Sequence, residues 1–269
     1  MKRVHISLAL LSVAAAIGCS RFSADAPPDS SDGGDDSPGS ATSGGIALRG
    51  KAQFPLQPGT AVVLSSPAES QPGDAILIAV AVTQSMAPAM VTAPAGFTVK
   101  GSRRIQGPAG CSWLDLAYFA GQAERGGADT YTFKVDATSD GTHPVGLTGL
   151  LASYSGVDLV QPIEDERESA LDRDVPDGGA PQTVFYTTPS LTTLVPNTEL
   201  LYFVGDNGGG SWLAPEAGAE FVTDTGVLAM FAMRSPAAGT TAAQRFALRA
   251  PLCGYTGGGA KLFALRPAK

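Results

Sequence analysis

Gly and Pro recur along this chain at intervals too short for a long helix. The sequence has 33 Gly and 20 Pro among 269 residues, and no window of twelve or more residues shows a 3.6-residue apolar periodicity without one of them inside it. Both residues favour turns. Because 43% of the residues are hydrophobic, the chain can still form a packed core. These features predict an all-β fold.

Short apolar segments bounded by turn signals are the predicted strands. Residues 75–82 follow the turn at 71–74, and their unbroken apolar character is typical of a strand covered on both faces. Residues 113–119 and 130–135 alternate in part, as a strand with one buried face does. Residues 147–154 form a further predicted strand.

An internal repeat links two halves of the body, about 55–160 and 185–268. The segment 66–97 recurs about 122 residues later, and Leu114–Tyr118 pairs with Val227–Phe231 in this alignment. Two copies close most economically as one sandwich with a shared core. We therefore expect residues 46–269 to form a single jelly-roll-like β-sandwich of about eight to ten strands, built from two repeated halves.

The N-terminus reads as an export signal. Lys2 and Arg3 precede the apolar run 6–17, whose twelve residues are too few for a membrane span of about 20. The residues Ala-Ile-Gly-Cys at 16–19 resemble the lipobox of bacterial lipoproteins. The resemblance implies a signal peptide at 1–18, two acyl chains on Cys19 and, with Ser20 next, an outer-membrane anchor facing the periplasm or the cell surface. The alternative is a secreted protein with a chance cysteine.

Residues 19–45 predict a disordered linker behind the lipidated cysteine. They are almost entirely Ser, Asp, Gly, Pro and Ala, so they cannot bury enough apolar surface to offset the entropy of ordering. We expect a spacer that holds the body away from the bilayer.

Charge and histidine content exclude several partners and cofactors. The net charge of −7 and pI of 4.8 disfavour nucleic-acid binding. His143 is the one histidine after residue 19 and lies in a predicted surface turn, so no multi-histidine zinc site forms. No metal or cofactor is predicted, although calcium binding by the acidic connection 164–177 stays open.

Cys111 and Cys253 form an even pair outside the reducing cytoplasm, which predicts a disulfide between the two halves. Two buried free thiols are the alternative.

Several motifs are similar to an uncharacterised β-sandwich module of bacterial extracellular and phage-associated proteins. They are Pro-Gly-Asp at 72–74, Ala-Pro-Ala-Gly-Phe at 93–97, and Ala-Ser-Tyr-Ser-Gly-Val-Asp at 152–158 with Pro-Ile at 162–163. The resemblance covers residues 60–268, although Phe97 stands where the module has Trp. It implies a β-sandwich in an extracellular setting and no catalytic residues.

Two segments carry candidate chemistry. Glu164, Glu166 and Glu168 share one face if the segment is extended, as the carboxylates of sandwich-fold glycosidases do. The alternative is a solvated connection between the halves. Asp206, Asn207 and Trp212 place a carboxylate, an amide and an indole in one glycine-rich loop, and such groups bind sugars; a loop with Trp212 in the sandwich edge is the alternative.

We therefore expect a surface-displayed lipoprotein with a non-catalytic binding or structural module that binds carbohydrate or another envelope component. A glycan-active hydrolase that uses Glu164, Glu166 and Glu168 is the alternative, and the oligomeric state stays open.

Overall fold

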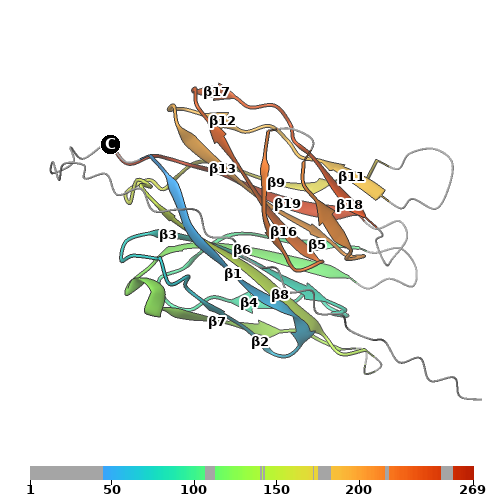
Figure 1. Ribbon diagram of the computed structural model, residues 1–269. Helices are drawn as coiled ribbons and strands as arrows, with labels where there is room; N and C mark the ends of the chain where they lie inside the picture. The colour runs from blue at the N-terminus through green and yellow to red at the C-terminus, as the bar shows by residue number, and fades with distance from the viewer. Residues whose placement is uncertain are drawn as a thin grey trace, which may run out of the picture. The chain divides into compact units, whose positions relative to one another are not determined.

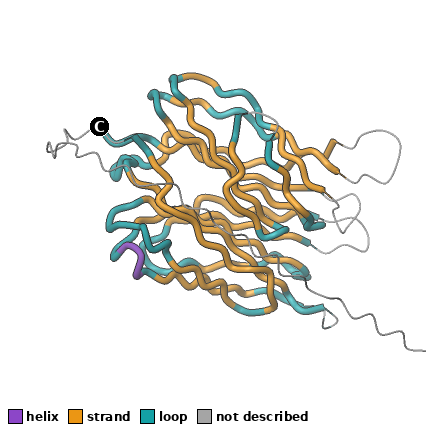
Figure 2. Tube along the Cα trace, in the orientation of Figure 1, coloured by secondary structure: helices purple, strands orange, loops and turns teal. Residues whose placement is uncertain are grey.

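A computed structural model describes residues 45–106, 113–139, 141, 143–171, 173–174, 183–215, 218–249 and 257–269. These residues belong to one compact unit, Ala41–Lys269. The all-β prediction is confirmed: the described residues form nineteen strands and one 3₁₀ turn at Gly126–Ala128 (Figure 2). Within them, no helix is long and apolar enough to cross a bilayer.

The first half of the body contains two antiparallel sheets (Figure 1). Five strands form the larger sheet, in the order β1 (Ala47–Pro58), β8 (Gly146–Ser155), β3 (Ala75–Thr83), β6 (Leu114–Gln122) and β5 (Thr98–Ile105). Three strands form the smaller sheet, in the order β2 (Ala61–Ser65), β7 (Thr130–Asp136) and β4 (Met90–Thr92).

The second half is built in the same way. Its larger sheet has the order β15 (Glu220–Asp224), β16 (Leu228–Ser235), β13 (Thr198–Asp206), β19 (Gly258–Leu265) and β9 (Ile163–Leu171). Its smaller sheet has the order β10 (Arg173–Asp174), β11 (Thr183–Thr187), β18 (Arg245–Arg249) and β14 (Ser211–Leu213). A short pair, β12 (Thr192–Thr193) and β17 (Gly239–Thr240), lies beside it.

The strand order is the same in both halves. The order β1-β8-β3-β6-β5 corresponds to β9-β19-β13-β16-β15, and β2-β7-β4 corresponds to β11-β18-β14. The acidic segment after Pro162 is thus an edge strand equivalent to β1, and the repeat starts earlier than the sequence indicates. The alignment of β6 with β16 also moves by one residue, because Tyr118 and Met230, not Phe231, face the same core.

Three apolar cores separate four layers of sheet. One core lies between the sheets of the first half, one between the sheets of the second half, and one between the two five-stranded sheets. The expectation of one sandwich with eight to ten strands is therefore wrong, although both halves do share a core. The reason is visible in β3, all nine residues of which are buried: a sheet with two apolar faces needs a cover on each side.

The two five-stranded sheets lie face to face with their equivalent strands in reversed order. Edge strand β1 contacts β15, whereas edge strand β5 contacts β19 and reaches β9. Because β1 corresponds to β9 and β15 to β5, these contacts are equivalent, and an approximate two-fold axis relates the halves. We name the β5–β9 side the first seam and the β1–β15 side the second seam.

Each seam is fastened by a lysine that spans the two halves. A β-bulge at Lys100 interrupts the β5–β6 register, and a bulge at Val222 interrupts the β15–β16 register. A bulged residue leaves the ladder, so its carbonyl needs another donor. The amine of Lys261 donates to the carbonyl of Lys100, and the amine of Lys51 donates to that of Val222.

Candidate binding groove

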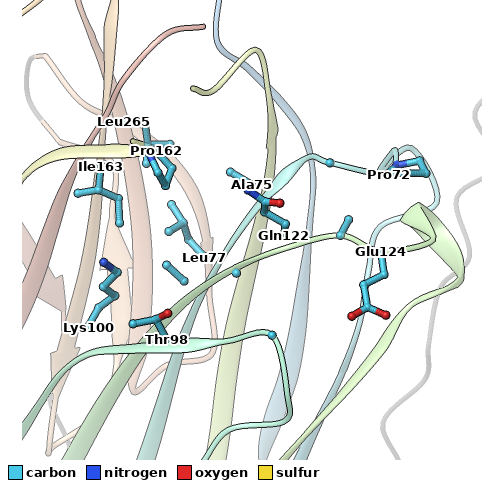
Figure 3. A pocket seen from close by; sticks show the side chains of 15 residues that line it. Pro72, Ala75, Leu77, Thr98, Lys100, Gln122, Glu124, Pro162, Ile163 and Leu265 are labelled. Carbon is cyan, nitrogen blue, oxygen red and sulfur yellow. The ribbon is translucent and has the colours of Figure 1, made fainter. Parts of the chain in front are cut away.

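A large hollow in the described part of the body lies at the first seam. We call it the seam groove; its volume is about 620 Å³. Strands β3, β5 and β6 of the first half form one wall, and the start of β9 with the end of β19 forms the other (Figure 3). The lining residues are Pro72, Gly73, Ala75, Leu77, Gly96, Thr98, Lys100, Ala120, Gly121, Gln122, Ala123, Glu124, Pro162, Ile163 and Leu265.

Aliphatic side chains form the floor of the seam groove. Leu77, Ile163 and Leu265 belong to or pack against the core shared by the halves. None of the described residues that line the groove is aromatic. A ligand there meets aliphatic carbon rather than the flat ring faces on which sugars stack.

Polar groups rise from the rim of the same groove. The Lys100 side chain is half-buried and makes no ion pair with any described residue. Figure 3 shows Lys100 and Glu124 at opposite ends, with Thr98 and Gln122 between them. The Gln122 amide donates to the carbonyl of Leu159 at 3.3 Å, so the loop after β8 is tied to this rim.

The second seam has an equivalent groove, but it is half as large. Its volume is about 310 Å³, and its lining residues are Ile46, Ala47, Leu48, Glu199, Gly218, Glu220, Ala232, Met233 and Arg234. In this groove Glu199 and Arg234 are cross-strand partners, joined by an ion pair of 3.6 Å. Arg234 also donates to the carbonyl of Ile46.

One difference between the two grooves is a cross-strand pair. Ala75 and Gln122 are partners in β3 and β6, where Glu199 and Arg234 are partners in β13 and β16. Ala75 leaves open the space that the carboxylate of Glu199 fills at the second seam. Burial holds the pKa of Glu199 above its ordinary value although Arg234 opposes the shift.

The three predicted catalytic glutamates lie on β9, but they do not share one face. A register shift beside Leu265 takes Glu164 out of the alternation, and its Oε1 accepts a hydrogen bond of 2.7 Å from Thr198 Oγ1. Glu166 pairs with the buried Lys261 at 3.4 Å.

Glu168 reaches across the first seam to Arg103 on β5, at 3.3 Å. Gly101 makes room for it, since a Cβ there would lie 2.1 Å from Glu168 Oε2. The buried Tyr118 hydroxyl lies near this pair. Burial raises the pKa of Tyr118, and the Glu168 carboxylate adds to the rise while Arg103 opposes it. The ion pair thus connects the halves.

The predicted sugar-binding residues lie at the end of β13 and on β14. Asp206 is fully buried and accepts hydrogen bonds from the Tyr186 hydroxyl and, at 2.6 Å, from the backbone N–H of Gly208. Trp212 is 5% exposed, and its ring lies 6.3 Å from that of Phe231 in the core of the second half. Asn207 is 9% exposed. Sugar binding by these residues stays a prediction.

The structure says less about the other residues that the sequence analysis named. His143 is exposed beside the turn at Gly141. Cys19, Cys111 and Cys253 lie outside the described residues, so the lipid anchor and the disulfide stay predictions. Among the residues that the structure describes, no three acidic, His or Cys side chains are grouped as metal ligands; part of the acidic segment 164–177 lies outside them.

Sequence reasoning missed the seam groove although it had noted several of its residues. Pro72, Gly73, Gly96, Pro162 and Ile163 all belong to motifs that carry the resemblance to the extracellular module, and all line the groove. Aligning the two copies of the repeat position by position gives the missing signal, because small residues in the first copy occupy positions that are equivalent to those of large residues in the second.

Comparisons with known proteins do not assign the chain to a family. A scan against protein-family models finds no match, and neither the curated proteins nor the solved structures contain a match.

Proposed function

We propose that this chain is a surface-displayed lipoprotein whose β-sandwich-like body is a non-catalytic binding module, with the seam groove as its ligand site. The observation that carries the proposal is internal to the chain. Two equivalent hollows exist, and the first is twice as large as the second, where the Glu199–Arg234 ion pair occupies the positions of Ala75 and Gln122. A purely structural seam gains nothing from an open hollow, since filled space adds dispersion contacts.

A transplant of that ion pair tests the proposal. The variant Ala75→Glu/Gln122→Arg places the residues of the second groove in the first, and the reciprocal Glu199→Ala/Arg234→Gln is the matched control. The full chain and both variants are titrated with oligosaccharides, short peptides and fatty acids. Binding that the transplant removes and the control keeps supports the proposal. A full chain that binds none of the three classes, or binding unchanged by the transplant, contradicts it.

A transplant that unfolds the chain would leave this test without a result, so a second variant accompanies it. Gln122→Arg alone changes an exposed residue at the rim and adds volume there without a buried charge at position 75. Thermal unfolding of each variant establishes that the fold is kept. A smaller loss of affinity than in the transplant is the expected result.

The positions of the three glutamates support a non-catalytic body. A retaining glycosidase needs two carboxylates that face one sugar ring about 5 Å apart. Glu166 and Glu168 are instead paired with Lys261 and Arg103, and Glu164 is bonded to Thr198. The hydrolase alternative predicts that Glu168→Gln abolishes glycan cleavage by the full chain, whereas the binding module cleaves none.

The lipid anchor has its own test. We expect cells that express the full chain to incorporate an alkyne fatty acid into it, and Cys19→Ala to remove both the label and the membrane association. Label that persists in Cys19→Ala contradicts the anchor.

The strand order supports a jelly-roll-like description of each half. In the first half, successive strands alternate between the two sheets, except that β5 and β6 follow each other in the larger sheet, and the first and last strands, β1 and β8, are neighbours. The second half repeats this order.

A further inference from the structure

We infer that the seam groove takes a short aliphatic peptide with free termini, its carboxylate at Lys100 and its amino end at Glu124. This inference rests on the proposed binding function and specifies the ligand class for the same site.

The first step is the charge of Lys100. Its side chain is half-buried in the groove and has no ion-pair partner among the described residues. The other two lysines at the seams are engaged, since Lys51 and Lys261 donate to carbonyls of the opposite half. Because the Lys100 ammonium lacks a carboxylate partner among the described residues, an anionic ligand group is the natural complement.

The second step is the aliphatic floor. Leu77, Ile163 and Leu265 line the groove, and Figure 3 shows Leu77 between Lys100 and Gln122, with Ile163 and Leu265 beyond the amine of Lys100. Leu77 and Leu265 are 2% and 0% exposed, so the partly buried Ile163 provides the accessible apolar surface of the three. Such surface gains by covering methyl and methylene groups. The described lining residues include no aromatic ring, and thus none of them offers the stacking surface that a sugar ring uses.

The third step is the far rim, which distinguishes a peptide from a fatty acid. Thr98 and Gln122 offer a hydroxyl and an amide along the groove, and Glu124 offers an exposed carboxylate at its end. Amide groups and an ammonium satisfy these side chains, whereas a polymethylene chain satisfies none of them. The volume of about 620 Å³ lies within the range of pockets that enclose small ligands.

Calorimetric titration of the full chain with the tripeptide Ala-Leu-Ala tests the inference. The arms are the free tripeptide, its C-terminal amide, its N-acetyl derivative and decanoate. We expect the amide to bind about tenfold or more weakly than the free acid, because it loses a charge-assisted hydrogen bond. In Lys100→Met the acid and the amide should bind equally, and Glu124→Gln should remove the penalty for N-acetylation.

Each other outcome overturns the inference. An acid and an amide of equal affinity for the unmodified chain, or decanoate bound in place of the peptide, refutes the peptide as the ligand. If another class binds and the Ala75→Glu/Gln122→Arg transplant blocks it, the peptide inference fails while the proposed function stands. If no class binds, both fail. Lys100→Met leaves the backbone carbonyl that Lys261 uses in place, and thermal unfolding checks its fold.

Discussion

Leu116 fits into a depression formed by two glycines of the opposite sheet, and this contact gives a quantitative test of the stacked layers. Gly205 and Gly259 are cross-strand partners in β13 and β19. A Cβ built on Gly205 would lie 2.9 Å from Leu116 Cδ2, and one built on Gly259 would lie 2.8 Å from Leu116 Cδ1. Leu116 itself is 1% exposed, so its side chain fills the depression.

We predict that Leu116→Ala lowers the free energy of unfolding by about 3–5 kcal/mol, as fully buried leucines do. Gly205→Ala alone should cost roughly 1–3 kcal/mol, because its methyl group collides with Leu116. In the double variant the same methyl group occupies part of the cavity. The combined loss should therefore be smaller than the sum of the single losses by about 1–2 kcal/mol.

Urea unfolding of the full chain and the three variants measures these values, with tryptophan fluorescence as the signal and a common m-value as the check on compactness. Single effects that add within about 0.5 kcal/mol would refute the reasoning, because residues that do not touch are additive. Such a result would mean that the two five-stranded sheets do not pack in this way.

Two further predictions concern the fastening of the body. Burial raises the pKa of Asp129, but hydrogen bonds from Arg125 and Glu124 outweigh it and hold the pKa below its ordinary value of 3.8. The stability that this carboxylate provides is thus complete above that value and is lost as the pH falls through the lowered pKa. Asp129→Asn should cost about 1–3 kcal/mol at pH 7, and urea titrations at lower pH should show the gap closing; a constant gap contradicts the assignment. Lys51→Met should lower the free energy of unfolding by about 0.5–1.5 kcal/mol, because the Val222 carbonyl loses its donor. Thermal unfolding measures this loss, and an unchanged melting temperature would show that the hydrogen bond from Lys51 contributes nothing.

The sequence indicated the strands and the repeat but not the number of layers. The segment 75–82 was expected to be covered on both faces, and β3 is buried on both. In β6, Leu116 and Tyr118 face the shared core while Phe119 faces the core of the first half. A single sandwich has one core and cannot bury both faces of the same sheet. A sheet covered on both faces needs at least three layers, and the repeat of this sheet in the second half adds the fourth.

The contacts across the seam lay beyond sequence reasoning. Arg103 and Glu168 are 65 residues apart, and Lys261 donates to a carbonyl 161 residues away. No local pattern encodes such pairs, so β9 read as a solvated connection. An edge strand in which many residues are charged has the same sequence pattern as a solvated linker. Only the structure of the opposite sheet shows which residues pair with those charges.

Methyl NMR tests most directly the central claim that a short peptide binds in the seam groove. The full chain, labelled at leucine and isoleucine methyl groups, is titrated with Ala-Leu-Ala. The account predicts saturable shifts at Leu77, Ile163 and Leu265, with no shift at Leu48 in the second groove. Shifts at Leu48 without any at these three residues, or no shifts at all, would contradict it.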